Sequence, residues 1–130
     1  MRTPAVWLAL AGLMGAWGVG AAAWASHGIA DPHVRGLIET ASRILLAHAA
    51  ALPGLCALLS APSARLPRVP LLLAGWMVAL GALLFAAGVH GSALGGPRTL
   101  SAAAPWGGSA MIAGWLVAVA AGVAGAVRRN

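Results

Sequence analysis

The chain has 130 residues, of which 61% are hydrophobic and only 8% are charged, and its mean hydropathy is +0.89. Because about a quarter of the residues of a soluble domain are charged, this composition excludes an ordinary soluble protein and indicates an integral membrane protein. The net charge of +6 comes from arginines that separate apolar runs instead of forming a patch, which argues against nucleic-acid binding.

Four uncharged runs lie between the charged residues, and each is long enough to cross a bilayer once. Spanning ~30 Å of hydrocarbon takes roughly 20 apolar residues. Lipid offers no partner to free backbone groups, so each span is expected to be a helix. We predict an all-α fold, an integral membrane bundle of four transmembrane helices in one domain over 1–130, with spans near 5–25, 42–60, 69–90 and 105–127.

The first span ends near the sequence AWA at 23–25, which resembles a signal-peptide cleavage site. Its apolar run of about 20 residues is longer than the roughly 7–15 residues of a signal-peptide core. We therefore expect this span to be retained as a transmembrane helix.

The segment before the second span has helix signals of its own. Asp31 and Pro32 are suited to the N-cap and first position of a helix. Arg35, Glu39 and Arg43 then recur every four residues, the spacing of an ion-pair stripe along one helix face. This pattern predicts a short outer amphipathic helix that continues into the second span.

The second span itself contains a helix breaker and the single cysteine of the chain. Pro53, followed by Gly54, predicts a kink, because proline leaves the carbonyl of Ala49 without its helical partner. Cys56 lies in an apolar run, where an inert buried thiol is expected.

Small residues recur at four-residue spacing in several spans, which favours close helix packing in a bilayer. Pro105 fits the first turn of the fourth span, and the fourth span then carries Gly107, Gly108, Gly114 and Trp115. Its complete stripe consists of Ala110, Gly114, Ala118, Gly122 and Ala126. The first span has a shorter stripe of Gly12, Ala16 and Gly20, and the third has Gly75 and Ala79. Such faces predict a tight bundle, with the packing partner either in this chain or in another.

Charge and tryptophan positions suggest an orientation. One side of the membrane would hold both chain ends and the 61–68 loop, with Arg2, Arg65, Arg68, Arg128 and Arg129. The other side would hold only three arginines together with both acids, so the positive-inside rule predicts cytoplasmic termini in a bacterial inner membrane. Trp7 and Trp76 would mark the inner interface and Trp24 and Trp106 the outer one, while Trp17 and Trp115 would fill space between helices.

The pattern of Pro105, Gly107 and Gly108 followed by Gly114 and Trp115 resembles the small membrane proteins grouped with transmembrane protein 256, the family of domain of unknown function 423. The resemblance covers nearly the whole chain. It implies a four-helix inner-membrane protein whose biochemical function is not established.

Three further segments match the family's motifs in part. AAWASH at 22–27 corresponds to a Gly-Ala-Phe-Gly-Ala-His motif, with alanine in place of both glycines. Thr40, Ala41, His48 and Ala49 fit the second-span pattern, although Ile44 stands where tyrosine is usual. FAAGVH at 85–90 places His90 where the family's third span ends in tyrosine.

Histidines are the candidate site residues, and all four fall on the predicted outer side. His48 lies about five residues inside its span, roughly 7 Å deep at 1.5 Å per residue, and should face the bundle. With His27 or His90 it could form a site for copper, zinc or a haem iron. The alternative is that His48 hydrogen-bonds a neighbouring helix, while His27 and His90 sit at the headgroups.

The sequence carries no recognisable catalytic set, no phosphate-binding glycine loop and no paired carboxylates. We therefore expect a membrane protein without catalytic activity, acting as an accessory or assembly subunit of a larger membrane complex or as a homo-oligomer. A histidine-based metal or haem site is the second hypothesis. A small transporter is the third, although close packing and little polar lining argue against it.

Overall fold

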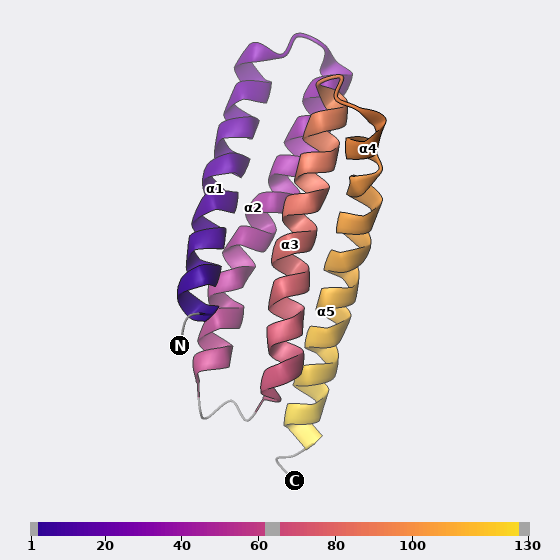
Figure 1. The fold of residues 1–130 in the computed structure, drawn as a ribbon. Coiled ribbons are helices and arrows are strands. Elements are labelled where there is room, and N and C mark those ends of the chain that lie inside the picture. The colour runs from indigo at the N-terminus through magenta and orange to yellow at the C-terminus, as the bar shows by residue number, and fades with distance from the viewer. Residues whose placement is uncertain (1–2, 62–65, 128–130) are drawn as a thin grey trace.

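The structure is a computed structural model that describes residues 3–61 and 66–127 (Figure 1). It contains α1 (Thr3–Gly28), α2 (Pro32–Ser60), α3 (Arg68–Ala93), α4 (Arg98–Ser101) and α5 (Ala103–Val127), and the described residues form no strand. Four helices are long and apolar enough to cross a membrane, the fourth being α4 and α5 taken together. The all-α prediction is confirmed, and the chain is a multi-pass membrane protein.

The four long helices run alternately up and down. The start of α1, the end of α2, the start of α3 and the end of α5 lie at one end, and the α1–α2 and α3–α5 connections lie at the other (Figure 1). Each predicted span lies within one of these helices. Of the arginines that suggested the orientation, Arg68 is described, whereas Arg2, Arg65, Arg128 and Arg129 lie outside the described residues.

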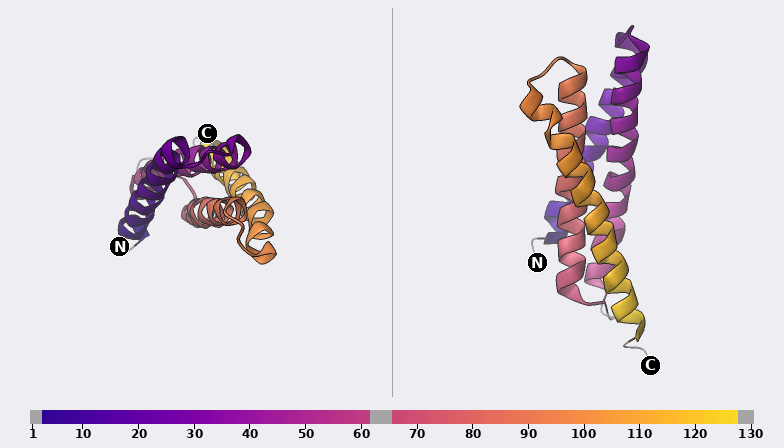
Figure 2. Two further views of the ribbon diagram at one scale, coloured as in Figure 1. Left: turned by 90° about the horizontal axis from the view of Figure 1, so that it is seen from above. Right: turned by 90° about the vertical axis from the view of Figure 1, so that its right-hand side faces the viewer.

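The helices form an open arc and do not close into a ring. The main contacts join α1 to α2, α2 to α3, and α3 to α5, whereas α1 touches α3 only slightly. Seen from above, α1 and α5 lie on opposite sides of the molecule (Figure 2). The core lies along α2 and α3, where Leu45, Leu52 and Val78 are fully buried. The two end helices, α1 and α5, therefore each keep a long uncovered face.

The buried faces follow an alternating spacing of three and four residues. On α5 they are Gly107, Met111, Gly114, Ala121 and Gly125, and on α1 they are Trp7, Ala11, Met14, Gly18 and Ala25. An average near 3.5 residues keeps one side of a helix turned toward its neighbour. The core side chains of each helix therefore follow the helix axis more closely than the small-residue stripes do.

The small-residue stripes only partly coincide with these faces. A step of four residues turns about 40° beyond one full turn at 3.6 residues per turn, so a long stripe winds away from the contact. On α5, Gly114 is buried, but Gly122 and Ala126 are exposed. On α1, Gly12 and Gly20 are exposed, and a Cβ added at either would meet nothing within 4 Å. The first-span stripe does not pack within this chain.

Glycines hold α3 and α5 at short range. A Cβ added at Gly107 would lie 2.6 Å from the Gly81 carbonyl oxygen, and one at Gly88 would lie 2.6 Å from the Ala104 nitrogen. Such backbone contact is how helices associate in lipid, where no hydrophobic force draws them together. Gly108 differs, since its added Cβ would meet only the Phe85 ring, at 3.8 Å.

Helix ends agree closely with the sequence signals. The Asp31 side chain accepts hydrogen bonds from the backbone nitrogens of His33, at 2.8 Å, and Val34, at 3.4 Å, so it caps α2 as predicted. The expected outer helix forms the first turns of α2, which continues unbroken through Pro53. Pro105 is the third residue of α5 and thus lies in its first turn.

The C-terminus of α3 uses a glycine in the left-handed conformation. Gly95 has a φ of +76°, and the next nitrogen, of Gly96, donates to the Gly91 carbonyl at 2.8 Å. This pairing satisfies carbonyls that the helix end would otherwise leave free. It turns the chain toward α4 and so sets the return path of α5.

Candidate functional site

Two tryptophan–histidine pairs lie within the helix bundle, and each is anchored to a backbone carbonyl of α2. The first pair joins Trp17 of α1 to His90 in the last turn of α3. The Trp17 Nε1–H donates to His90 Nδ1 at 3.0 Å, and His90 Nε2 lies 3.3 Å from the Ile38 carbonyl oxygen. His90 is only 7% exposed, so this contact joins three helices inside the core.

The second pair joins His48 of α2 to Trp115 of α5. The Trp115 Nε1–H donates to His48 Nε2 at 3.2 Å, and His48 Nδ1 lies 2.7 Å from the Ile44 carbonyl oxygen of its own helix. The ring centroids are 6.1 Å apart and tilted by 52°, a geometry close to the 5.6 Å and 56° of Trp17 and His90.

The two histidines are held as opposite neutral tautomers. An indole N–H can only donate and a carbonyl oxygen can only accept. In His90, Nδ1 must therefore be bare and Nε2 must carry the proton. In His48 the proton must lie on Nδ1 and Nε2 must be bare. Each imidazole thus uses its one donor and its one acceptor in hydrogen bonds within the protein.

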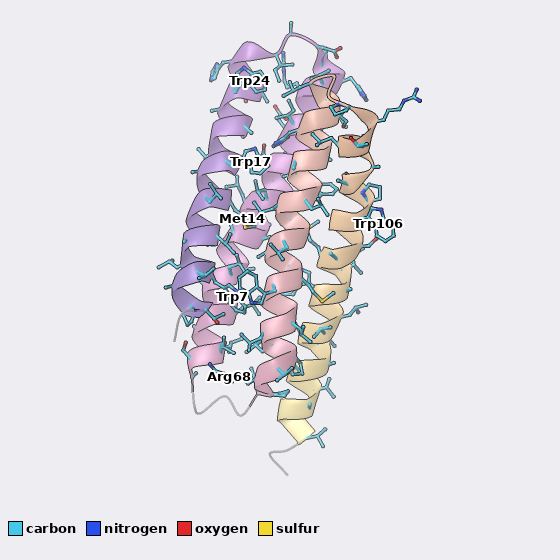
Figure 3. The ribbon with its side chains drawn as sticks, viewed as in Figure 1. Trp7, Met14, Trp17, Trp24, Arg68 and Trp106 are labelled. Atoms are coloured by element: carbon cyan, nitrogen blue, oxygen red, sulfur yellow. The ribbon has the colours of Figure 1, made fainter. Side chains whose placement is uncertain are left out.

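The surroundings of the two pairs differ. Trp17 points from α1 into the bundle (Figure 3), and His90 is buried. His48 is only half-buried, and Trp115 is 40% exposed on the outer side of α5. The first pair is enclosed by three helices, whereas the second lies at the edge of the seam between α2 and α5.

The histidines predicted as metal or haem ligands are not gathered into one site. His27 is exposed in the last turn of α1, and both ring nitrogens of His48 and of His90 are already hydrogen-bonded. Residues 3–61 and 66–127 contain no group of three or more His, Cys, Asp or Glu side chains arranged to hold a metal ion. This arrangement matches the alternative reading for His48, a hydrogen bond to a neighbouring helix. His90 is buried between helices in the last turn of α3.

The expected outer ion-pair stripe is only half formed. Arg43 pairs with Glu39 at 3.1 Å, on the solvent side of α2. Arg35 instead donates through Nε and an Nη atom to the Ile29 carbonyl, at 3.0 and 2.7 Å. Its guanidinium is thereby held by the α1–α2 connection, because two N–H groups on one part-buried carbonyl outweigh a surface ion pair.

Trp7, expected at the inner interface, is instead wedged between α1 and α3. It is fully buried, and its ring fills the space beside Gly75 while meeting Trp76 edge-on, with centroids 6.2 Å apart (Figure 3). The described residues offer its Nε1 no hydrogen-bond partner. By contrast, Trp106 points away from the bundle and Trp24 is half-exposed, as expected of interfacial tryptophans.

Sequence reasoning missed the two tryptophans as histidine partners and interpreted Trp17 and Trp115 as space-filling residues. Both tryptophans lie next to a buried glycine, Gly18 or Gly114, but neither belongs to the buried strip of its helix. No signal in the sequence therefore distinguished them as histidine partners.

A family described as "Protein of unknown function (DUF423)" has a sequence model that matches residues 21–108, more than half of the chain. The match spans the end of α1 through the start of α5 and so includes His48 and His90. No solved structure matches the chain significantly.

Proposed function

We propose that this chain, which belongs to the DUF423 family of proteins of unknown function, is a non-catalytic accessory or assembly subunit of a larger membrane complex. Membership of the family does not itself assign an activity. It would work by docking its uncovered helix α1 against a partner helix in a bacterial inner membrane.

The observation that carries this proposal is the open arc with α1 at its edge. α1 packs mainly on α2 and has little contact with α3. Its outward face carries Gly12, Ala16 and Gly20, all exposed. Lipid-facing positions need no small residues, whereas helix–helix contacts in membranes are enriched in them.

The outer face of α5 offers a comparison within the same chain. Both end helices expose large aliphatic side chains, among them Leu13 and Val19 on α1 and Leu116 on α5. The small-residue stripes differ, because Gly114 of the α5 stripe already packs against α3, whereas all three residues of the α1 stripe are exposed. We therefore propose α1 as the protein-facing edge.

The polar groups within the helices support a structural role over a catalytic one. The ring nitrogens of His48 and His90 are engaged in hydrogen bonds to tryptophans and to α2 carbonyls. Hydrogen bonding within and between helices therefore explains the presence of both histidines without a bound substrate.

For the orientation we propose cytoplasmic termini, from the positive-inside rule. Single cysteines at Ser92, at the opposite end, and at Leu66, in a Cys56→Ser background, would test this with a membrane-impermeant thiol reagent. Labelling of the Ser92 position from outside intact cells is expected. Labelling of the Leu66 position instead would reverse the orientation.

The experiment for the accessory role is native mass spectrometry of the protein extracted gently from its own membranes. We expect a stoichiometric partner chain, retained in Gly122→Leu and lost in the double variant Gly12→Leu with Gly20→Leu. Gly122 is a matched control, because an added Cβ there also meets nothing within 4 Å. Detection of a lone monomer, or of a self-oligomer unaffected by the double variant, would refute the proposal.

A further inference from the structure

We infer that the outward face of α2 is the contact surface for a second copy of this chain, in which Arg43 of each copy pairs with Glu39 of the other. The twofold axis of this dimer lies along the membrane normal, so the two α2 helices run in the same direction and present the same surface to each other. This surface is separate from the uncovered face of α1 and does not depend on the partner proposed for that face.

The outward face of α2 differs from the other uncovered faces because its middle part carries no large apolar side chain. The large exposed apolar residues of α2 are Leu37 and Leu58, near its two ends, whereas α1, α3 and α5 expose such residues along most of their length. Between them, exposed residues recur at alternating spacings of three and four, and they are Thr40, Arg43, Ala47, Ala50, Gly54 and Ala57. Contact with lipid tails gives no reason for such a face, whereas helix–helix contacts in membranes are enriched in small residues.

The spacing of these residues keeps the face turned in one direction along α2. An average near 3.5 residues is the repeat with which two helices stay in contact over several turns, and the buried faces of α1 and α5 show the same repeat. From Thr40 to Ala57 the face is roughly 25 Å long at 1.5 Å per residue. A second α2 helix can therefore pack against it across most of the ~30 Å of the hydrocarbon core.

The charged end of this face lies near the level of the exposed Trp106. Trp115 and His48 share one level, because they are hydrogen-bonded. On α5, Trp106 comes nine residues before Trp115. On α2, Arg43 comes five residues before His48, so its backbone lies about 6 Å deeper in the membrane than that of Trp106. Side chains of a helix lean toward its N-terminus, and the Arg43 guanidinium accordingly reaches Glu39, one turn nearer the helix start, at 3.1 Å.

The charges on this face are complementary to themselves, which identifies a second copy as the occupant. Within the described residues, the Arg43 guanidinium donates through Nη2 alone, to Oε2 of Glu39, and the Arg43 side chain is 76% exposed. A guanidinium has five N–H donors and a carboxylate has two acceptor oxygens, so both groups have unused capacity. Twofold symmetry places Arg43 of each copy beside Glu39 of the other, and the four charges alternate in sign and sum to zero. A lipid phosphate would satisfy Arg43 but would be repelled by Glu39.

Disulfide cross-linking of the full chain in its native membranes tests the contact. Ala47→Cys and Ala50→Cys, each in a Cys56→Ser background, are oxidised with copper phenanthroline. We expect a linked dimer from both variants, because the twofold axis brings each position close to its own copy. Leu116→Cys, exposed at a similar depth on α5, is the matched control and should stay monomeric. A dimer from neither α2 position, or equal yields from all three variants, would overturn the inference.

Charge reversal then distinguishes a second copy from a lipid headgroup. In the Ala47→Cys protein, Glu39→Arg or Arg43→Glu alone brings four charges of one sign together and should abolish the cross-link. Both reversals combined restore the alternation of charges and should recover it, whereas a cross-link lost in the combined variant, or unchanged in all three, would contradict the pairing. Gly12→Leu with Gly20→Leu should leave the cross-link intact, so the failure of the α1 proposal would not affect this one. Loss of the cross-link in that variant would mean that the copies meet through α1 instead of α2.

Discussion

The Trp17–His90 and Trp115–His48 pairs use the same atoms in different surroundings. In both pairs an indole N–H donates to the unprotonated imidazole nitrogen, and the protonated imidazole nitrogen donates to a carbonyl of α2. The first joins three helices around a ring that is 7% exposed, and the second lies under an indole that is 40% exposed. The first pair therefore ties three helices together inside the bundle, whereas the second joins two helices at an outward-facing seam.

Replacing the buried histidine should have the largest effect. His90→Ala leaves a cavity and deprives the Trp17 N–H of its acceptor, so we expect a loss of about 2–4 kcal/mol in unfolding free energy. Reversible unfolding in bicelles, followed by steric trapping, measures this loss. His27→Ala, at the exposed end of α1, is the control and should stay within about 0.5 kcal/mol of the unchanged protein. Equal losses in both variants would mean that the buried pair does not hold the three helices together.

The glycine seam should give the next largest effect, because it holds α5 against α3. At Gly107→Ala the new methyl group meets the backbone of Phe85 and the Gly81 carbonyl, so the helices must move apart, at a cost of about 1–3 kcal/mol. Gly108→Ala, one residue away, meets only ordinary contact and should cost little. The same unfolding assay compares the two. A similar loss in both would show that close approach at Gly107 does not hold α5.

Removing only the indole N–H compares the two pairs directly. Trp17→Phe leaves a buried His90 nitrogen without its donor, and we expect a loss of about 1–2 kcal/mol at pH 8. Trp115→Phe leaves a His48 nitrogen near the bundle edge, and a loss of about 0.5 kcal/mol is typical of such bonds in membranes. If Trp115→Phe proved the more damaging, burial would not determine how much each bond contributes.

The smallest effect should come from the exposed ion pair on α2. The Arg43 side chain is 76% exposed, and pairs of this kind contribute at most about 0.5 kcal/mol. Glu39→Gln should therefore change the unfolding free energy by no more than that, and added salt should reduce the difference further. A loss above about 1 kcal/mol would show that this pair, and not the histidines, orders the outer end of α2.

Local features of this fold could be predicted from the sequence, and contacts between helices mostly could not. The spans, the Asp31 cap and the place of Pro105 follow from hydropathy and from the hydrogen-bonding needs of one helix end. The packed faces depend on the neighbour's direction, and for that reason the stripe through Gly122 and Ala126 winds out of the contact while Gly107 lies in it.

The candidate site shows the same division. The sequence leaves two interpretations open for His48, a metal or haem ligand and a hydrogen bond to a neighbouring helix, and the structure contains the hydrogen bond, to Trp115. No pattern along the chain links residue 17 to residue 90 or residue 48 to residue 115, because those pairings arise only when three helix directions are set together. The four-residue spacing predicts an ion pair between Arg35 and Glu39, yet in the structure Arg35 donates to the Ile29 carbonyl in the turn before α2.

The most direct test of the account is the 15N spectrum of the histidine-labelled chain in lipid at about pH 8, with His48 and His90 assigned from His48→Gln and His90→Gln variants. An unprotonated ring nitrogen resonates far from a protonated one, so the spectrum identifies each tautomer. The account predicts a neutral His48 with its proton on Nδ1 and a neutral His90 with its proton on Nε2. The same tautomer in both residues, or a charged His90, would contradict it.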